Sequence, residues 1–486
     1  MATNGTFKLD WTTFYNVIDG KLETTSKTRH SVNPSTLEAN PEVPVSTPED
    51  VDRAVQAAKK AQEAWAETPY EERQKALARF GEAIEAHAEE FALMLTKEQG
   101  KALTPPPPLR EQLQSSHFEV AEAIKHFKGM SNLSFPEEVV DNNPDRRVIT
   151  RYTPLGVAVG IVPWNFPILL ACGKIAPGLV TGNAFILKPS PFTPYCDLKL
   201  AELAQQFFPP GVFQALSGDD NLGPWLTSHP GVDKVSFTGS TATGKRVMES
   251  CSKTLKRVTL ELGGNDAAIV LPDVDVKAVA PKISMLALYN SGQVCIAIKR
   301  IYIHEAIYDE LVAEIANFVK NLPVGDGQQE GSVLGPVQNQ MQFDRVKELL
   351  KDIDEQKLKV VAGSTASASS HGKGYFITPT IVDNPPDDSR IVVEEPFGPV
   401  FPVLKWSDEK DVIHRANDTL MGLGASVWSK DLDKAQSIAK KLKAGNIWIN
   451  THLELQYDAP FGGHKQSGIG YEYGAGGLKA YCNVQS

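Results

Sequence analysis

From Arg151 onward the sequence alternates short apolar segments with segments of helical periodicity, and this alternation limits the fold more than any other feature. The pattern predicts strands at 156–162, 184–187 and 234–237, each followed by a helix, at 167–181, 197–208 and 241–250. Strands that alternate with helices form parallel βαβ units, because a parallel connection must cross over the sheet. A second region of this kind runs from about 264 to 459, so we expect an α/β fold with parallel sheets.

Two helices are predicted before this region. Thr47-Pro48-Glu49-Asp50 has the pattern of a capping box with proline at the first helical position. Thr68-Pro69-Tyr70-Glu71 repeats this start signal, and an apolar stripe continues from Leu77 to Leu95 at helical spacing. Gly100 is the expected C-terminal stop. We therefore expect a packed helical layer here.

Three segments interrupt or follow the regular pattern. Pro105-Pro106-Pro107-Pro108 cannot lie inside a helix and predicts a stiff loop. Residues 141–147 are polar and rich in turn formers, and predict a link from a projecting segment to the next strand. Residues 480–484 predict an edge strand that needs a partner.

The composition is that of a globular protein with a large core. Of the 486 residues, 42% are hydrophobic and 22% charged, and this length favours two or three domains. The net charge is −10 and no basic cluster stands out, so we expect no binding to nucleic acid or to an anionic membrane. The first ten residues resemble neither a signal peptide nor a transit peptide, and no apolar run has membrane-spanning length, so the expected location is cytoplasmic.

The cysteines do not form a recognisable framework. There are five, at Cys172, Cys196, Cys251, Cys295 and Cys482. They are scattered and odd in number and show no C-x-x-C spacing, which favours neither disulfides nor a zinc site. We expect no metal and a reducing compartment.

One of these cysteines lies in a segment with catalytic potential. Asn290-Ser291-Gly292-Gln293-Val294-Cys295 places a thiol after a small, flexible turn, and Glu261 lies upstream in Leu260-Glu261-Leu262-Gly263-Gly264-Asn265. A thiolate attacks carbonyl carbons, and a glutamate among glycines can move protons beside it. Taken alone, Cys295 is more often a buried, inert thiol.

A glycine-containing turn at 237–244 indicates a phosphate site. It follows a strand and opens a helix, where main-chain N–H groups attract phosphate. The G-x-G-x-x-G fingerprint is absent. Gly239 to Lys245 spells most of a P-loop, but Arg246 stands where Ser or Thr must bind magnesium, which disfavours an NTPase.

Three further turns carry polar or aromatic side chains. Lys188, just past a strand end, can bind ribose hydroxyls or a phosphate, although such a lysine is usually only solvated. Asn165, between two prolines, is either an oxyanion donor or the cap of the next helix. In Glu394-Glu395-Pro396-Phe397-Gly398-Pro399, Glu395 can bind a ribose and Phe397 can support a flat ring.

Taken together, these segments resemble the aldehyde dehydrogenase superfamily over nearly the whole chain. Seven motifs occur in family order: Pro163-Trp164-Asn165-Phe166-Pro167, Leu187-Lys188-Pro189-Ser190, Phe237-Thr238-Gly239-Ser240-Thr241, Glu261-Leu262-Gly263-Gly264, Gly292-Gln293-Val294-Cys295, Glu395-Pro396-Phe397-Gly398-Pro399 and Pro460-Phe461-Gly462-Gly463. The resemblance implies that Cys295 is the nucleophile, that Asn165 and the Cys295 N–H form the oxyanion hole, and that Glu261 activates water. It implies oxidation of an aldehyde to the acid through a cysteine thiohemiacetal and thioester.

The resemblance also implies a nicotinamide cofactor. Its expected contacts are Ile161, Pro163, Trp164, Lys188, Ser190, Gly223, Phe237, Gly239, Ser240, Glu395 and Phe397. Pro191 stands where many NAD-preferring relatives carry a glutamate that faces the ribose, so NAD and NADP both stay open.

The family's architecture implies the domains. A Rossmann-like dinucleotide-binding domain is expected over 1–132 and 151–263, and a catalytic α/β domain over 264–459. Residues 133–150 and 460–486 are the expected β extension that joins subunits into a homodimer or homotetramer.

By family position the substrate contacts are Leu169, Ile296, Thr451 and Leu455. This lining is mainly apolar, with His452 and Glu454 added, and it lacks an arginine for a second carboxylate. A hydrophobic or aromatic aldehyde is therefore the hypothesis, and an acidic semialdehyde is disfavoured. Two alternatives stay open: an enzyme that transfers the acyl group to coenzyme A, and a non-catalytic protein on the same scaffold.

Overall fold

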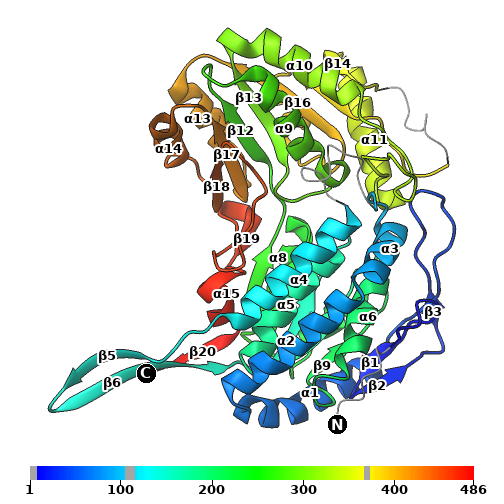
Figure 1. The fold of residues 1–486 in the computed structure, drawn as a ribbon, viewed down its shortest axis with the longest axis vertical. Coiled ribbons are helices and arrows are strands. Elements are labelled where there is room, and N and C mark those ends of the chain that lie inside the picture. The colour runs from blue at the N-terminus through cyan, green and yellow to red at the C-terminus, as the bar shows by residue number, and fades with distance from the viewer. Residues whose placement is uncertain (1–7, 104–114, 366–372) are drawn as a thin grey trace.

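Two large sheets, each covered by helices, organise the chain in a computed structural model that describes residues 8–103, 115–365 and 373–486 (Figure 1). A thin antiparallel ribbon projects from the body. The parallel pairing inside both sheets confirms the predicted α/β fold. The stiff loop predicted at the four-proline run lies outside the described residues.

The first sheet has the order β19-β11-β10-β7-β8-β9-β1-β2. Its strands are β1 (Asn16–Ile18), β2 (Lys21–Glu23), β7 (Val157–Ile161), β8 (Ala184–Lys188), β9 (Phe213–Ala215), β10 (Lys234–Thr238), β11 (Arg257–Glu261) and β19 (Gly468–Ile469). The helices of this part are α1 (Pro48–Glu67), α2 (Tyr70–Ala86), α3 (Ala88–Gln99), α4 (Ser116–Asn132), α5 (Pro167–Val180), α6 (Tyr195–Ala204), α7 (Leu222–Ser228) and α8 (Thr241–Ser252). The five strands β7 to β11 pair in parallel, and β7 to β10 are buried throughout, as the apolar segments predict, whereas β11 begins with an exposed Arg257.

The connections in this sheet reverse direction beside β7. The chain runs from β7 through β8 to β9, and then returns to place β10 on the other side of β7. Such a switch point opens a crevice at the carboxyl ends of the strands, where ligands bind in open α/β sheets. The ends of β7, β8 and β10 and the loops after them carry the predicted cofactor residues except Gly223, on α7, and Glu395 and Phe397, after α12.

The second sheet has the order β14-β15-β16-β13-β12-β17-β18. Its strands are β12 (Asp266–Val270), β13 (Ile298–His304), β14 (Val360–Ala362), β15 (Thr380–Asp383), β16 (Val400–Trp406), β17 (Gly424–Trp428) and β18 (Asn446–Ile449). Its helices are α9 (Val276–Leu288), α10 (Tyr308–Lys320), α11 (Gln340–Glu355), α12 (Arg390–Val393), α13 (Glu409–Asn417) and α14 (Leu432–Ala439), with short 3-10 turns η2 (Tyr289–Gly292) and η3 (Glu305–Ile307). All its strand pairs are parallel except β14 with β15.

The projecting ribbon joins β5 (Glu138–Asn143), β6 (Arg146–Pro154) and the C-terminal strand β20 (Cys482–Gln485). The predicted C-terminal edge strand thus finds its partner in β6 of the same chain. Nearby, η4 (Lys465–Ser467), β19 and α15 (Gly474–Lys479) return the chain to the first sheet, where β19 pairs with the end of β11. A small pair, β3 (Thr28–Arg29) with β4 (Val43–Pro44), lies near the N-terminus.

Two predictions about the early helices need correction. The capping box at Thr47 forms as expected, and Gly100 ends α3 with a left-handed φ of 93°. Thr68, however, does not start a helix: it caps the end of α1, and its hydroxyl donates to the Ala64 carbonyl oxygen at 3.1 Å. The single apolar stripe also belongs to two helices, because the backbone breaks at His87 (φ −109°, ψ 16°).

Candidate active site

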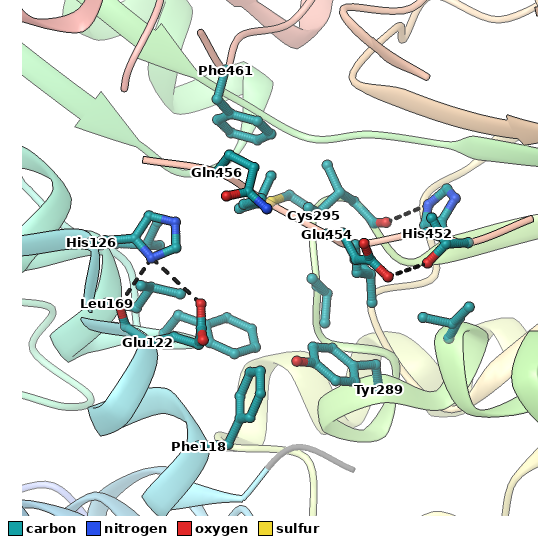
Figure 2. A pocket seen from close by; sticks show the side chains of 18 of the residues that line it. Phe118, Glu122, His126, Leu169, Tyr289, Cys295, His452, Glu454, Gln456 and Phe461 are labelled. Carbon is teal, nitrogen blue, oxygen red and sulfur yellow. Dashed lines mark hydrogen bonds and ion pairs between the residues drawn. The ribbon is translucent and has the colours of Figure 1, made fainter. Parts of the chain in front are cut away.

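Three predicted catalytic side chains meet in one cavity. Cys295, Glu261 and Asn165 come from parts of the chain up to 130 residues apart, and all three line a cavity of about 560 Å³. Other walls come from α4, from α5 and from the segment 450–456 (Figure 2). The cavity therefore joins the first sheet to the second.

The loop before Cys295 has an unusual backbone. Asn290, Ser291 and Gly292 have successive positive φ angles of 49°, 55° and 75°. A Cβ at Gly292 would lie 2.1 Å from the Gly398 carbonyl oxygen, so a residue without a side chain is required there. The loop is compact and strained, as is common where a reactive group is positioned.

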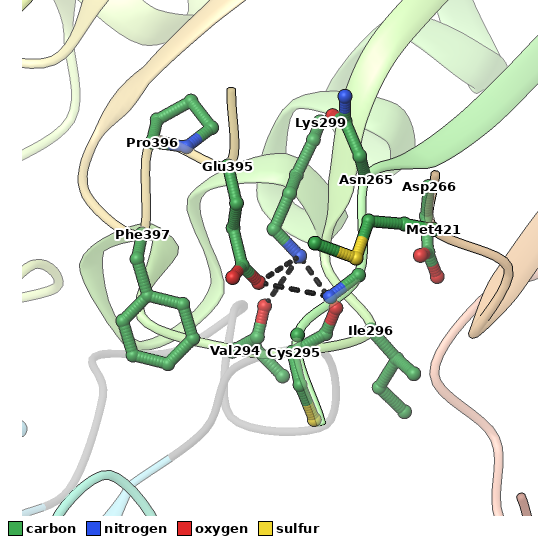
Figure 3. Close-up of polar contacts among 12 residues, drawn as sticks. Asn265, Asp266, Val294, Cys295, Ile296, Lys299, Glu395, Pro396, Phe397 and Met421 are labelled. Carbon is green, nitrogen blue, oxygen red and sulfur yellow. Dashed lines mark hydrogen bonds and ion pairs between the residues drawn. The ribbon is translucent and has the colours of Figure 1, made fainter. Parts of the chain in front are cut away.

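Lys299, which was not predicted from the sequence, holds this loop through hydrogen bonds to its main chain. Its ammonium donates to the carbonyl oxygens of Val294 (2.8 Å) and Cys295 (2.5 Å), and it lies 3.4 Å from Glu395 Oε1 (Figure 3). The Gly264 N–H donates to the same Glu395 oxygen at 3.1 Å. Glu395 is thus tied to the nucleophile loop in this state of the protein.

Burial controls the protonation of Cys295. It raises the pKa of the thiol well above its usual value, the negative charge of Glu261 raises it further, and Lys299 opposes both. The resting state therefore holds a neutral thiol. A nearby base must take its proton before it attacks a carbonyl carbon.

Glu261 is the acidic group beside this thiol. It ends β11, is 2% exposed, and neither carboxyl oxygen has a hydrogen-bond partner of standard geometry. Burial, and next the carboxylate of Glu472, raise its pKa to about 7. Such a carboxyl exchanges its proton near neutral pH, which suits a general base.

Glu472 and its partners were also missed. Its carboxylate contacts the buried ammonium of Lys174, and it accepts a hydrogen bond from Ser236 Oγ at 3.0 Å. Lys174 lies on α5 and Glu472 follows β19. The ion pair therefore brings two segments that are far apart in the sequence together beside Glu261.

Asn165 occupies the turn after β7 and is 3% exposed. Its Nδ2 donates to the Gln293 carbonyl oxygen at 3.0 Å, which leaves its second amide hydrogen for another acceptor. The Asn290 amide donates to the Asn165 carbonyl oxygen at 3.1 Å. Asn165 is therefore bound to the nucleophile loop, and the alternative in which its side chain caps α5 is wrong.

The N-terminus of α5 is held by another helix instead. Glu119 on α4 accepts hydrogen bonds from the Ile168 and Leu169 N–H groups at 3.1 and 3.3 Å. Its other oxygen contacts the buried ammonium of Lys101, which also donates to the Asn165 carbonyl oxygen at 3.1 Å. This pair adds to the rigidity of the turn.

The predicted cofactor residues gather around the switch point of the first sheet. Ile161, Lys188 and Phe237 lie at or next to the carboxyl ends of β7, β8 and β10. Trp164, next to Pro163, meets the distant Phe397 edge to face, with ring centroids 5.4 Å apart. Strand ends of the first sheet and the segment after α12 therefore come together here.

Other predicted cofactor residues lie near the carboxyl end of β8. Burial lowers the pKa of Lys188 to about 8, and its ammonium donates to the Pro189 carbonyl oxygen at 3.0 Å. A Cβ at Gly223 would lie 3.8 Å from Lys188 Cε, so these two residues are neighbours. The Ser190 hydroxyl accepts from the Phe192 N–H at 3.2 Å and supports its own turn.

The position at which α8 begins argues against a P-loop. Ser240 is the N-cap of α8, and its hydroxyl accepts from the Thr243 N–H at 3.3 Å. Residues from Thr241 onward are helical, and Lys245 binds Gln466 at 2.9 Å. Only Gly239 and Ser240 remain as loop before the helix, so the long phosphate loop of a P-loop NTPase is not formed.

All four predicted substrate residues, Leu169, Ile296, Thr451 and Leu455, line the cavity. His452 and Glu454 also line the cavity, and His452 supports the nucleophile loop as well, because its Nε2 hydrogen-bonds the Ile296 carbonyl oxygen at 2.8 Å. The structure adds lining residues from helices remote in sequence: Phe118, Glu122, Lys125, His126, Lys282 and Tyr289. Two of these are lysines, so the missing arginine alone does not exclude a second carboxylate.

Known proteins match this chain over nearly its full length. The sequence model of the aldehyde dehydrogenase family matches residues 22–486. The chain is 43% identical to the FUS7 protein of Gibberella fujikuroi over 479 residues, which are 98% of this chain and 99% of that protein.

Solved structures agree with this match. An aldehyde dehydrogenase from Bacillus cereus in an NAD⁺ complex is 33% identical with a TM-score of 0.92, over 97% of this chain and 95% of that chain. An NADP-dependent enzyme from E. coli is 32% identical with a TM-score of 0.92, over 98% of each chain. These likenesses place the protein among the α/β oxidoreductases. It belongs to the aldehyde dehydrogenase family.

Within residues 8–103, 115–365 and 373–486, no helix has both the length and the apolar character needed to span a membrane.

Proposed function

We propose that the protein oxidises an aldehyde to the carboxylic acid with a nicotinamide dinucleotide, and that Cys295 carries the substrate covalently. The main support is the meeting of Cys295, Glu261 and Asn165 in one cavity of a family member. A thiol, a base with a pKa near 7 and a fixed amide donor are the groups that covalent carbonyl oxidation requires.

The first step forms the covalent bond. Glu261 accepts the thiol proton, and the sulfur attacks the carbonyl carbon to give a thiohemiacetal. The spare amide hydrogen of Asn165 and the Cys295 main-chain N–H stabilise the oxyanion, each donor typically contributing ~3–4 kcal/mol. The bound cofactor supplies the hydride acceptor.

The second step releases the product. Loss of hydride from the carbon leaves a thioester on Cys295. Glu261 releases the thiol proton to solvent and then removes a proton from a water molecule, whose oxygen attacks the thioester carbonyl. The carbon–sulfur bond breaks, the acid leaves, and the sulfur takes up a proton to become the neutral thiol again. Retention of this carboxylate favours hydrolysis over transfer to coenzyme A.

We place the dinucleotide at the switch point of the first sheet. The α8 N-terminus with Gly239 and Ser240 suits the pyrophosphate, and Lys188 and Glu395 suit ribose hydroxyls. Pro191 offers no carboxylate to repel a 2′-phosphate, so we propose NAD or NADP as the cofactor. Glu395 contacts Lys299 and Gly264 through Oε1, which leaves Oε2 for a ribose hydroxyl.

Steady-state assays test this function. The purified protein is mixed with aliphatic, aromatic and acidic aldehydes and either cofactor, and reduced cofactor and product are measured. We expect a free acid, and no activity in Cys295→Ser. Acyl-CoA as the main product when coenzyme A is added, or full activity in Cys295→Ser, would contradict the proposal.

A further inference from the structure

His126 presents an unused hydrogen-bond acceptor to the cavity. The residue lies on α4, is 1% exposed and lines the cavity with Cys295. Its Nδ1 is 2.9 Å from the Glu122 carbonyl oxygen and 3.6 Å from Glu122 Oε2. Its Nε2 is buried and has no partner, and Figure 2 shows it turned toward the side where Gln456 lies.

The neighbours of Nδ1 fix the tautomer. A carbonyl oxygen and a carboxylate both accept hydrogen bonds, so the ring proton must be on Nδ1. Burial lowers the pKa of His126, which keeps the ring neutral. The Nε2 atom therefore carries a lone pair and accepts a hydrogen bond, but it cannot donate one.

The surroundings favour a neutral donor over a cation. Lys125 holds Glu122 at 3.1 Å, so the nearest carboxylate is already neutralised. Besides Gln456, the cavity walls nearby include the apolar or aromatic side chains of Phe118, Leu169 and Tyr473, and the Tyr473 ring centroid is 5.1 Å from that of His126. A buried acceptor without a partner in such walls costs free energy, which a donor on a bound molecule would offset.

We propose that His126 forms a specificity subsite and that the aldehyde substrate carries a hydroxyl group on an apolar body, which donates to His126 Nε2. This inference rests on the proposed function, because it takes the cavity to be the aldehyde site. It narrows the substrate class from apolar aldehydes to hydroxylated ones.

Matched substrates test it with the unaltered enzyme. Benzaldehydes with a hydroxymethyl group at the para or meta position are compared with the ethyl analogues of nearly the same shape and with the methoxymethyl analogues, which accept but cannot donate. We expect kcat/KM for the better hydroxymethyl isomer to exceed both analogues by about three- to tenfold, the range of one neutral hydrogen bond.

Variants assign the preference to the residue. In His126→Phe the ratio of hydroxymethyl to ethyl kcat/KM should fall to about one, and His126→Gln, which keeps an acceptor, should retain part of it. The ratio compares two substrates on one preparation, so partial loss of folded enzyme cancels. His414→Phe, the same change on an exposed residue of α13, should keep the wild-type ratio.

The outcomes separate the two proposals. Equal kcat/KM for all analogues at both positions, or a preference that survives His126→Phe, would overturn the subsite while aldehyde oxidation stands. Failure of the enzyme to oxidise any aldehyde would overturn the proposed function, and the subsite with it.

Discussion

At the scale of single residues, the site depends on one carboxyl group held away from partners. Glu261 is buried, has no ion-pair partner among the described residues and lies next to a second acid, and burial together with the charge of Glu472 raises its pKa to about 7. An ion pair would have fixed its charge and removed its use as a base. Burial disfavours the charged carboxylate and so raises its pKa. For this reason Glu261 can accept a proton first from the sulfur and later from water.

Replacement of this acid should slow both halves of the reaction. In Glu261→Gln thiol attack and thioester hydrolysis both lose their base, so we expect reduced cofactor to form more slowly even in the first turnover, and steady turnover to fall ~10²–10⁴-fold. Stopped-flow absorbance measures both phases. Glu98→Gln, at a buried acid that binds main-chain N–H groups of α6, is the matched control. Undiminished steady turnover in Glu261→Gln would reject Glu261 as the base.

The second acid should set the pH at which hydrolysis becomes fast. The base works deprotonated, so the hydrolysis rate should rise with pH through about 7 in the wild type. In Glu472→Gln a negative neighbour is lost and Lys174 stays, so the Glu261 pKa falls and the rise moves to lower pH. A pH–rate profile of thioester hydrolysis measures this shift, and a profile that moves to higher pH would contradict the electrostatic account.

At the scale of elements, the nucleophile loop is held by a lysine at the start of β13. Lys299 joins two loop carbonyls to Glu395, so it couples the thiol to a group expected at the ribose. The left-handed backbone from Asn290 to Gly292 supplies no regular hydrogen-bond ladder of its own. The loop therefore needs this ammonium to stay in one conformation.

Removal of that ammonium should make the thiol less acidic and the loop less ordered. In Lys299→Met we expect alkylation of Cys295 by iodoacetamide to need a higher pH than in the wild type, because a positive charge near the sulfur is lost. We also expect kcat/KM to fall by about tenfold or more. Lys277→Met, on the exposed face of α9, controls for loss of a lysine. An unchanged pH profile of alkylation would show that Lys299 acts on neither the thiol nor its loop.

The same scale shows what the sequence could predict. The turns after β7, β8 and β10 were found because their residues follow strands directly, and local order fixes which edge of the sheet they reach. A helix does begin in the predicted segment 68–71, at Tyr70, but its N-cap is Pro69 and not Thr68, because Thr68 caps the end of α1. Lys174 and Glu472 are 298 residues apart, and His126 faces the cavity only through the packing of α4, so neither carries a local signal.

At the scale of the whole molecule, the ribbon extends into solvent and bears apolar side chains. The exposed fractions are 49% for Val139, 65% for Val140 and 64% for Val484. A group of exposed apolar side chains of this kind is typical of a surface that contacts another protein. Its edge strand β5 has one hydrogen-bonding side unpaired within the described chain. We propose that it joins subunits into a homodimer or homotetramer.

Charge on the ribbon should break this assembly. We expect the wild type to elute as a dimer or tetramer and the double variant Val139→Asp, Val140→Asp as a smaller species, because two buried aspartates would cost more than the contact provides. Size-exclusion chromatography with light scattering measures both masses. Leu432→Asp, at an exposed leucine of α14, should keep the wild-type mass. A monomeric wild type would refute the assignment.

The pairing of β19 with β11 has a consequence for synthesis. Gly468 lies opposite Glu261, and Glu472 follows a few residues later. The surroundings of Glu261 at the end of β11 are therefore completed by residues 468–472. The first sheet can begin to form on the ribosome long before that segment emerges. A chain cut short before 468 would hold the nucleophile without a finished site around it, so the reactive site is completed only after β19 has been made.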